Sequence, residues 1–315
     1  PPFRSCLRFG TSGPLRTVFS NGKSHIACDN LRFVTRWIAE GAYLNVGVII
    51  VNYNAGPALS HAAQSSIACA RVSQVVVVDN ASRDGSMAAL QAACGTSDKL
   101  RVVLNEVNRG FAVACNQALA TLDQAYLLYL NPDCVLTPAA LEALLAALVA
   151  DPRAAMAGPV LRYPDGRVQA GGRRAAPTPW RSFVRASGLY RLSRYFPRLL
   201  PDLVLPQEAL GDAASEVDAI SGACMLVRRE AMQCVGALDE GYFLHCEDLD
   251  WCMRFRLAGW KVLFVPRATV THEKGVCSVS RPVFVAWHKH RGMVRFYRKF
   301  YADQQAWPLR LAVLL

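Results

Sequence analysis

The sequence predicts an α/β fold in which a mostly parallel central sheet is flanked by helices. Between residues 45 and 130, short β-branched or leucine-rich runs alternate with helix-sized segments, which is typical of a parallel sheet covered by helices. The run 46–51 contains no polar side chain, as expected of a strand buried on both faces. The 315 residues are 52% hydrophobic and 19% charged, which excludes a disordered chain. No stretch of about 18 uninterrupted apolar residues is present to cross a membrane.

The predicted elements follow one another at short spacing. Expected strands cover residues 46–51, 75–78, 100–104 and 126–130, and expected helices cover 58–70, 86–94 and 112–122. Further along, 261–270 is an apolar strand, and a tight turn at 221–224 precedes the apolar segment 225–227. Residues 1–44 are rich in Ser, Gly and Arg, and the first Met of the chain is Met87. We interpret 1–44 as an N-terminal extension, either poorly ordered or upstream of the natural start.

Polar side chains stand at the carboxyl ends of three predicted parallel strands. They lie in the turns 52–54, 79–86 and 131–133. Ligands of open α/β sheets bind beyond these strand ends, so a nucleotide-type ligand is expected across the turns. Asp79 can accept hydrogen bonds from a base or ribose, and Asp133 can bind a hard divalent cation through oxygen. Each motif is also compatible with an ordinary turn, because Asp, Asn and Ser are common turn residues.

The loop Asn108-Arg-Gly-Phe-Ala112 lies between a predicted strand and a predicted helix. N–H groups at a helix N-terminus suit phosphate oxygens, Gly110 allows close backbone approach, and Arg109 adds a charge-assisted contact. A packed loop with Phe111 in the core is the alternative interpretation. Gly222, in the turn 221–224, likewise either admits a ligand or only permits a bend.

The most informative cluster is His245-Cys-Glu-Asp-Leu-Asp250, with three carboxylates in four positions. Such carboxylates repel one another, and their apolar and aromatic neighbours make a merely solvated charge run a poor interpretation. On a helix that begins near Glu247, Asp250 can pair with Arg254 at i,i+4. Glu247 and Asp248 are then free to face a pocket, and we expect Asp248 to act as a general base.

His272 follows the predicted strand 261–270. A neutral imidazole there either completes a metal shell or has only a structural role. The sequence contains no G-x-S-x-G elbow, no P-loop and no G-x-G-x-x-G, which disfavours serine hydrolases, P-loop NTPases and dinucleotide-binding enzymes.

In their order, these motifs resemble those of the inverting glycosyltransferases of family 2, and within it the bacterial rhamnosyltransferase-like branch of cell-envelope polysaccharide assembly. The resemblance covers about residues 45–300. It rests on Val-Ile-Ile-Val-Asn-Tyr-Asn, Val-Val-Asp-Asn-Ala-Ser, Asn-Arg-Gly-Phe-Ala, Leu-Asn-Pro-Asp, Ser-Gly-Ala-Cys-Met-Leu-Val-Arg-Arg, Glu-Asp-Leu-Asp-Trp and Ala-Gly-Trp-Lys-Val. It implies a GT-A (Rossmann-like) fold, a nucleoside-diphosphate sugar donor and a divalent metal, Mg²⁺ or Mn²⁺.

The resemblance also implies roles for individual residues. Asp79 would read the nucleotide base, and Asp133 would ligate the metal. His272 would join the metal or diphosphate site. Asp248 would remove the proton of the acceptor hydroxyl, with Glu247 beside it. The implied enzyme is a metal-dependent inverting glycosyltransferase that needs no covalent nucleophile.

The expected donor site and domain division follow from the same resemblance. Donor contacts are expected from Asn52, Tyr53, Asn54, Asp79, Ser82, Arg109, Gly110, Asn131 and Gly222. Asn131 stands where other members have the first Asp of a D-x-D pattern, and this branch commonly has Asn there. We expect a nucleotide-sugar-binding half (45–155), an acceptor and catalytic half with an Arg-rich insert (156–280) and a basic amphipathic C-terminal segment (281–315).

The partners implied are a nucleotide sugar, either dTDP-rhamnose or a UDP-sugar, and a lipid-linked or glycan acceptor. Rhamnose is the favoured sugar, and hexose, galactofuranose and N-acetylhexosamine stay open. The eleven cysteines are scattered, odd in number and form no C-x-x-C, which favours a reduced, cytoplasmic protein over a disulfide scaffold.

The net charge of +11 is unevenly distributed. Residues 153–198 carry ten basic and one acidic side chain, and 281–315 carry seven and one. The segments with the candidate site are acidic overall. We therefore expect a peripheral protein on the inner face of an anionic plasma membrane, contacted through an interfacial helix that begins near Ala286. A helix packed on the core with a solvated basic face is the alternative.

Two other function classes compete with the enzyme. The Arg-rich segment 153–198 and the pI of about 9.3 also suit a nucleic-acid-binding protein, although no recognised binding motif is present and we expect no nucleic-acid partner. The other alternative is a catalytically inactive sensor of sugar nucleotides.

Overall fold

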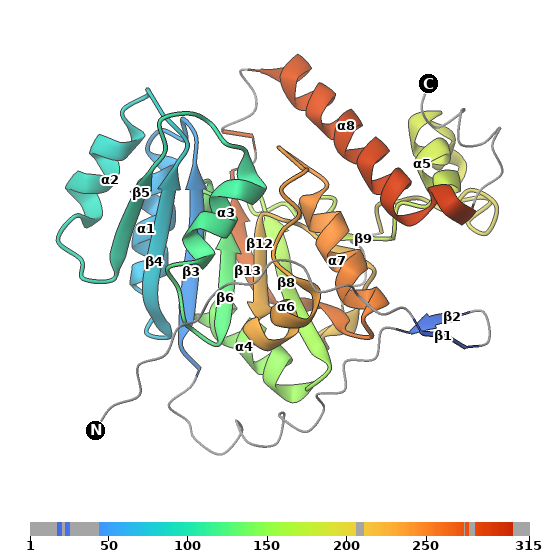
Figure 1. Ribbon diagram of the computed structural model, residues 1–315, viewed down its shortest axis with the longest axis horizontal. Helices are drawn as coiled ribbons and strands as arrows, with labels where there is room; N and C mark the ends of the chain where they lie inside the picture. The colour runs from blue at the N-terminus through green and yellow to red at the C-terminus, as the bar shows by residue number, and fades with distance from the viewer. Residues whose placement is uncertain are drawn as a thin grey trace.

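The computed structural model describes residues 18–20, 23–25, 44–205, 211–273, 275–276 and 281–304. A nine-stranded sheet runs through its main body (Figure 1). Its strands are β3 (Val46–Asn52), β4 (Val72–Asp79), β5 (Leu100–Leu104), β6 (Tyr126–Leu130), β7 (Cys134–Val135), β8 (Ala154–Arg162), β10 (Ser215–Glu216), β12 (Cys224–Arg228) and β13 (Lys261–His272). The order is β10-β13-β8-β12-β6-β3-β4-β5, and β7 pairs with β13.

The sheet is mixed but mostly parallel, as predicted. Strands β3, β4, β5 and β6 are parallel to one another, and β13 is parallel to β8. Strand β12 lies antiparallel between β6 and β8. Strands β3 and β6 are apolar because helices cover both of their faces: all seven residues of β3 and all five of β6 are buried. The expected division at residue 155 stays a prediction, and β8 crosses it.

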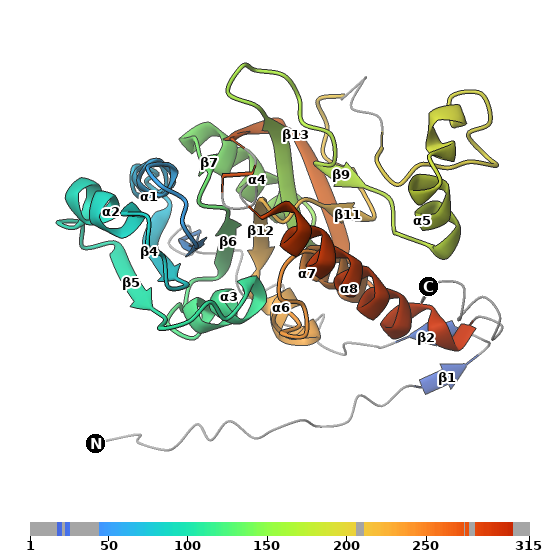
Figure 2. The same ribbon diagram turned by 90° about the horizontal axis from the view of Figure 1, so that it is seen from above.

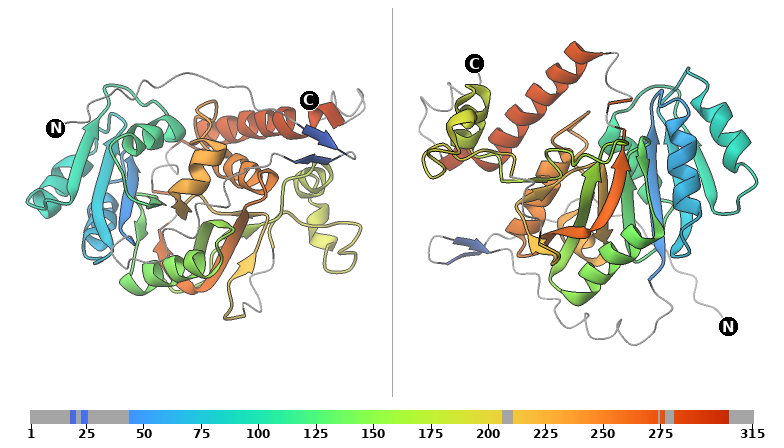
Figure 3. Two further views of the ribbon diagram at one scale, coloured as in Figure 1. Left: turned by 60° about the horizontal axis from the view of Figure 1, so that its bottom comes forward. Right: turned by 180° about the vertical axis from the view of Figure 1, so that it is seen from behind.

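Helices form one layer on each face of the sheet (Figures 2 and 3). They are α1 (Ala58–Ile67), α2 (Ser86–Cys94), α3 (Phe111–Leu119), α4 (Pro138–Ala150), α6 (Arg229–Val235), α7 (Glu247–Leu257) and α8 (Pro282–Phe300). One core cluster joins α1, α2 and α4 to the sheet, and a second joins α3, α6, α7 and α8 to the opposite face. Thr137 caps α4, because its Oγ1 accepts the Ala140 N–H at 3.1 Å and Pro138 occupies the first turn.

Four predicted boundaries differ from the observed ones by a few residues. The helix expected over 58–70 ends at Ile67, and the helix expected over 112–122 ends at Leu119. Strand β4 begins three residues earlier than predicted, because Val72 pairs with Val46 of β3. Strand β13 extends to His272, where it pairs with β7.

An excursion from the sheet lies between β9 (Arg173–Arg174) and β11 (Ala219–Ile220), which pair antiparallel. It contains α5 (Pro179–Ala186) and the short 3₁₀ helix η2 (Leu189–Leu192). Of the predicted extension, β1 (Val18–Ser20) and β2 (Lys23–His25) form a hairpin. The other residues up to 43, and residues 305–315 of the basic tail, lie outside the described residues.

The basic C-terminal segment forms helix α8, as predicted, but its second half is held by internal ion pairs. Arg295 and Lys299 each lie 2.8 Å from Asp239, and Lys299 lies 2.7 Å from the buried Asp250. This supports the packed-helix alternative for that half, because these charges are not free to face a membrane. Within the ranges given above, no helix is both long and apolar enough to cross a bilayer.

Candidate active site

The polar turns at the strand ends meet at one edge of the sheet. Asn52 and Asp79 end the neighbouring strands β3 and β4 and are partners in register. The Asn52 amide donates to Asp79 Oδ1 at 2.7 Å and to Ser86 Oγ at 2.8 Å. The Ser82 N–H donates to Asp79 Oδ2 at 3.0 Å. These bonds hold the Asp79 carboxylate beside the opening of α2.

The structure corrects the expected role of Asn52. Its side chain is 0% exposed, so a bound donor has no surface of this residue to contact. Asn52 instead supports the turn from the interior of the protein. Its amide nitrogen positions Asp79 and also lies 3.0 Å from the Ser82 hydroxyl oxygen. Asp79 keeps a small exposed surface of 5%, and Ser82 is half-buried. These two residues remain candidates for a nucleotide contact.

The turn after β3 carries Tyr53 and Asn54, both half-buried. Asn54 has a φ of 54°, a left-handed conformation that Asn tolerates better than most residues. Its side-chain oxygen accepts the Arg83 N–H at 2.7 Å. The Arg281 guanidinium lies 5.7 Å from the centre of the Tyr53 ring. The residue that precedes α8 therefore reaches the donor-side turn.

The loop 108–112 is packed, which supports the packed-loop interpretation, and Phe111 is half-buried against the core. Gly110 faces the backbone of Phe243, and the Phe111 N–H donates to the Phe243 carbonyl at 2.8 Å. That N–H is therefore not available to a phosphate. Arg109 is exposed and stays a candidate for a diphosphate contact. The loop joins the donor side of the sheet to the segment that leads into α7.

Replacing Gly110 with Ala tests this contact. Gly110 has a φ of 86° and a ψ of 168°, a region that only glycine occupies readily, and an added Cβ would lie 2.8 Å from Phe243 O. We expect Gly110→Ala to lower the free energy of unfolding in urea by about 3 kcal/mol or more. Gly85→Ala is the matched control, because Gly85 has a φ of 79° with nothing within 4 Å of the added Cβ, and about 1 kcal/mol is expected there. Equal losses would contradict the contact.

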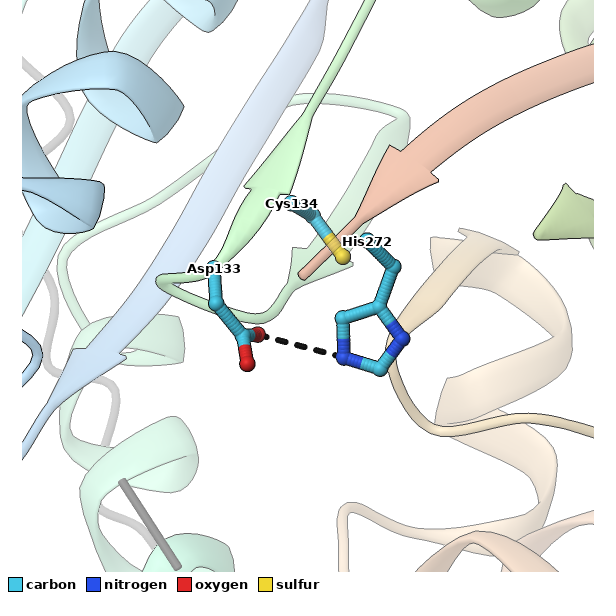
Figure 4. A group of neighbouring side chains, drawn as sticks. All are labelled: Asp133, Cys134 and His272. Atoms are coloured by element: carbon cyan, nitrogen blue, oxygen red, sulfur yellow. Dashed lines mark ion pairs between the residues drawn. The ribbon is translucent and has the colours of Figure 1, made fainter. Parts of the chain in front are cut away.

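Asp133 and His272 face each other across the ends of β6 and β13 (Figure 4). His272 Nε2 lies 3.2 Å from Asp133 Oδ1, and both residues are buried. Among the described residues, Asp133 Oδ1 nevertheless has no hydrogen-bond donor. A buried carboxylate oxygen without a donor is costly, and oxygen and imidazole nitrogen together suit Mg²⁺ or Mn²⁺. The residues present therefore fit the predicted divalent cation.

Gln169, which sequence reasoning missed, sets the tautomer of His272. The Gln169 amide nitrogen donates to the His272 carbonyl at 2.5 Å, so its oxygen is the atom 2.9 Å from His272 Nδ1. Nδ1 then carries the proton, and in the neutral ring the lone pair of Nε2 points at Asp133. A cation between these two atoms relieves the repulsion. This second contact to a ligating histidine is typical of metal sites.

Cys134 lies beside this pair (Figure 4), but its bonding is explained without a metal. Its thiol donates to the Ala223 carbonyl, with 3.4 Å between sulfur and oxygen, and it is completely buried. We therefore assign Cys134 to the core beneath the site.

The structure also corrects the expectation that Asp248 is free. It forms an ion pair with Arg174 of β9, and its Oδ2 accepts the Gly222 N–H at 2.9 Å. Burial opposes ionisation of Asp248, but the Arg174 charge and the N–H groups of Gly222 and Leu249 outweigh it and lower the pKa of this carboxyl. Asp248 is thus an ionised carboxylate. Arg174 gave no signal in the sequence beyond its place in an Arg-rich segment.

The turn 221–224 connects Asp248 to the segment that carries Asp133. Its Gly222 N–H binds Asp248, and its Ala223 carbonyl accepts the Asn131 N–H at 2.8 Å. Gly222 was predicted as a donor contact, but an added Cβ there would lie 3.2 Å from Asp248 Cβ. Its observed role is to position Asp248. The Asn131 side chain stays half-buried at the site edge.

Glu247 differs sharply from its neighbours. It is buried, and its Oε2 has no hydrogen-bond partner in the part of the chain that the structure describes. Burial and the Asp248 charge raise the pKa of Glu247 from 4.5 to about 8, so its carboxyl is mostly neutral at pH 7. Asp250, in contrast, pairs with Arg254 at 2.6 Å as predicted. The three carboxyl groups therefore differ in state: Glu247 is neutral, Asp248 is ionised, and Asp250 forms an ion pair with Arg254.

The shifted pKa of Glu247 predicts a pH-dependent stability. The folded protein binds the Glu247 proton more tightly than the unfolded chain, so its free energy of unfolding falls as pH rises from about 4.5 to about 8. Glu247→Gln removes this dependence. We expect the variant to gain stability relative to the wild type across that window, as measured by urea unfolding at several pH values. A constant difference would contradict the neutral assignment.

The chain reaches α7 through a strained turn. His245 and Cys246 have φ values of 67° and 72°, a conformation that is uncommon outside glycine and clusters at functional sites. Cys246 directly precedes Glu247, so this turn sets where the first residues of α7 point. Its sulfur also lies 3.8 Å from the Lys289 carbonyl of α8. The acidic helix end is therefore covered by α8.

Comparison with known proteins is consistent with this site. Residues 47–236 match glycosyl transferase family 2. An N-acetylglucosaminyl-diphospho-decaprenol L-rhamnosyltransferase of Mycobacterium tuberculosis is 32% identical over 275 residues, covering 84% of this chain and 87% of that protein. Rhamnosyltransferase WbbL of Escherichia coli is 38% identical over 68 residues, covering 22% of this chain and 25% of that protein.

Solved structures share the fold. Mannosyltransferase PcManGT from Pyrobaculum calidifontis, in complex with GDP-Man and Mn²⁺, has a TM-score of 0.54 at 20% identity and covers 90% of this chain and 74% of its own. GalNAc-T7 with UDP, GalNAc and Mn²⁺ has a TM-score of 0.55 at 19% identity, covering 74% of this chain and 44% of its own. The GT-A fold is confirmed. The chain belongs to glycosyltransferase family 2 and is a glycosyltransferase.

Proposed function

We propose that this enzyme transfers rhamnose from a nucleoside diphosphate to a hydroxyl group of a lipid-linked or glycan acceptor, with inversion at C1. The observation that carries the proposal is the turn 221–224, which binds an ionised Asp248 on one side and the Asn131–Asp133 segment on the other. The rhamnosyltransferase name of the Mycobacterium tuberculosis relative supports rhamnose and a diphospho-polyprenol acceptor. The reaction belongs to cell-envelope polysaccharide synthesis in this proposal.

Asp248 is the proposed general base. An acceptor hydroxyl has too high a pKa to attack C1 unaided, so a carboxylate must take its proton as the new C–O bond forms. Asp248 Oδ2 accepts from Arg174 and Gly222, whereas Oδ1 accepts, within the described residues, only the Leu249 N–H, at 2.8 Å. We assign the proton to Oδ1. Arg174 and Gly222 keep the carboxylate ionised and fixed in orientation.

Asp133 and His272 are the proposed holders of Mg²⁺ or Mn²⁺. When bound, the cation offsets the charge that develops on the departing nucleoside diphosphate. Gln169 contacts His272 at Nδ1, so that in the neutral ring Nε2 is the nitrogen without a proton, and Nε2 faces Asp133. The exposed Arg109 is proposed to contact the same diphosphate. Asn131, at the site edge, is a further donor contact.

Asp79 and Ser82 are the proposed contacts to the nucleotide base and ribose. Both belong to the hydrogen-bonded turn between β4 and α2, and Tyr53 and Asn54 border it from the end of β3. No covalent intermediate is needed, because the acceptor attacks C1 from the face opposite the leaving group. Glu247, neutral beside the base, is proposed to donate a hydrogen bond to the acceptor.

A panel of donors tests the proposed function. The full chain is incubated with dTDP-rhamnose, UDP-galactofuranose, UDP-glucose and UDP-N-acetylglucosamine, together with a short-prenyl diphosphate-linked N-acetylglucosamine acceptor. We expect dTDP-rhamnose to give the highest kcat/KM, with a product of inverted anomeric configuration by proton NMR. If a UDP-sugar gave the highest kcat/KM, that sugar would take the place of rhamnose in the proposal. A product with retained configuration would contradict the single displacement.

A further inference from the structure

A hairpin rich in arginine and aromatic residues stands away from the sheet, at the side opposite β5 (Figures 1 and 2). We call residues 179–200 the insert hairpin. It comprises α5, η2 and the turns that follow. It carries five arginines and no Asp or Glu. Neither the donor site nor the base uses any of its residues.

The insert hairpin exposes large apolar side chains. Leu199 is 64% exposed, Tyr195 61% and Phe196 56%. The exposed members are Trp180, Phe183, Leu192, Tyr195, Phe196 and Leu199. Such a group on one short segment marks an interaction surface, whereas singly scattered apolar residues do not.

The charges of the insert hairpin point to an anionic partner. Arg181 and Arg185 lie 3.8 Å and 3.0 Å from the carboxylates of Asp218 and Asp202, so they fasten the hairpin. The other three arginines are exposed and form no ion pair with any carboxylate of the described residues: they are Arg191, Arg194 and Arg198. Exposed arginines interleaved with aromatic and leucine side chains are typical of surfaces that bind the headgroup region of anionic bilayers.

The aromatic faces of the insert hairpin disfavour a nucleic acid. Base stacking needs open ring faces, but Arg185 lies 4.1 Å from the centre of the Tyr190 ring and Arg194 lies 4.5 Å from that of Tyr195. Trp180 and Phe183 stack on each other, with ring centres 5.5 Å apart. The surfaces of the insert hairpin that these contacts leave exposed include aliphatic side chains and ring edges. Such surfaces suit lipid better than nucleic-acid bases.

We propose that the insert hairpin is the surface by which this enzyme docks on an anionic lipid bilayer. Tyr195, Phe196 and Leu199 enter the headgroup and upper acyl region, and the unpaired arginines contact anionic headgroups. This differs from the expectation drawn from the tail, because Arg295 and Lys299 of α8 are held internally.

The insert hairpin is tied to the proposed base. The excursion that contains it leaves the fold at β9 and returns at β11, and these strands pair with each other. Arg174 of β9 pairs with Asp248, and Gly222, two residues after β11, binds the same carboxylate. Docking would therefore hold the base at a fixed height above the bilayer, where a lipid-linked acceptor presents its hydroxyl. This step rests on the proposed function.

Vesicle binding of the full chain tests the proposal. Binding is measured by co-sedimentation with vesicles of phosphatidylcholine, with and without phosphatidylglycerol. We expect binding only with phosphatidylglycerol, and the triple variant Tyr195→Ser, Phe196→Ser, Leu199→Ser to bind about tenfold more weakly or worse. Reversing Arg191, Arg194 and Arg198 to Glu is expected to weaken it about 10²-fold.

The control removes apolar side chains from the far side of the sheet. Leu104 is 70% exposed and Val107 65%, so Leu104→Ser, Val107→Ser is matched in exposure and should bind as the wild type does. Wild-type protein that ignores phosphatidylglycerol vesicles, or a control that loses as much binding, would overturn the proposal. A hairpin-dependent affinity for single-stranded DNA, or a dimer that the triple variant dissociates, with vesicle binding unchanged, would also overturn it.

Sugar transfer is measured separately from vesicle binding. The triple variant should keep the wild-type kcat on a water-soluble acceptor, and lose rate only when the acceptor is embedded in vesicles. Failure of all sugar transfer by the wild type would refute the proposed function while leaving the vesicle result standing. Loss of transfer to the soluble acceptor by the triple variant alone would assign the hairpin to the active site instead.

Discussion

Asp248→Asn is expected to lower kcat for glycosyl transfer by about 10²–10⁴-fold, the usual contribution of a positioned general base. The KM for the nucleotide sugar should change little, because Asp248 is proposed to act on the acceptor and not on the donor. The amide oxygen of Asn can still accept from Arg174 and from the Gly222 N–H, 2.9 Å from Oδ2, so the fold should persist, although the Leu249 N–H loses its acceptor. Steady-state kinetics and calorimetric donor binding measure both quantities.

The control for this variant is a test of whether its fold is intact. Thermal unfolding and donor affinity close to those of the wild type would show that the lost rate belongs to the proton transfer. A fully active Asp248→Asn enzyme would remove Asp248 from the role of base. It would also remove the reason to interpret the Arg174 contact as catalytic positioning.

Asp133→Asn is expected to weaken Mn²⁺ binding at least about tenfold and to lower kcat by about 10²-fold or more. The substitution keeps the shape of the side chain but removes the charge that faces His272 Nε2 at 3.2 Å. Titration with Mn²⁺ by electron paramagnetic resonance, in the presence of nucleoside diphosphate, measures the affinity without relying on turnover.

Cys134→Ser is the matched control for the metal site, because Cys134 lies next to Asp133 and His272 but is not a proposed ligand. The Cys134 thiol already donates to the Ala223 carbonyl, so this variant should keep the Mn²⁺ affinity of the wild type. Loss of Mn²⁺ binding in Cys134→Ser, or its retention in Asp133→Asn, would contradict the assignment of ligands.

The strands and their polar ends were predictable because both depend on local sequence. Apolar runs such as the one in β3 identify buried strands. Parallel strands place their carboxyl ends at one edge of the sheet, independently of the conformation of the loops. The positions of Asp79 and Asp133 at this edge were therefore predictable, whereas their roles stay predictions. The i,i+4 pair of Asp250 and Arg254 is local as well, and its 2.6 Å contact was expected.

The partners of these residues were not predictable, because they come from distant segments. Arg174 lies 74 positions before Asp248, and Gln169 lies 103 positions before His272. No periodicity or spacing connects such pairs. Gly110 shows the same limit: a glycine that allows close approach was expected, but its neighbour, Phe243, depends on how α7 packs. The ion pairs of Arg295 and Lys299 likewise became visible only once α8 was placed on the core.

Anomalous scattering from crystals grown with Mn²⁺ and a nucleoside diphosphate tests the central claim most directly, because it locates the metal independently of turnover. We predict a single strong anomalous peak between Asp133 Oδ1 and His272 Nε2, which lie 3.2 Å apart without the metal and should separate to admit it. The diphosphate should lie against that peak, on the side of the Asp248 carboxylate. A diphosphate bound with the manganese elsewhere, or with no manganese at all, would contradict the account.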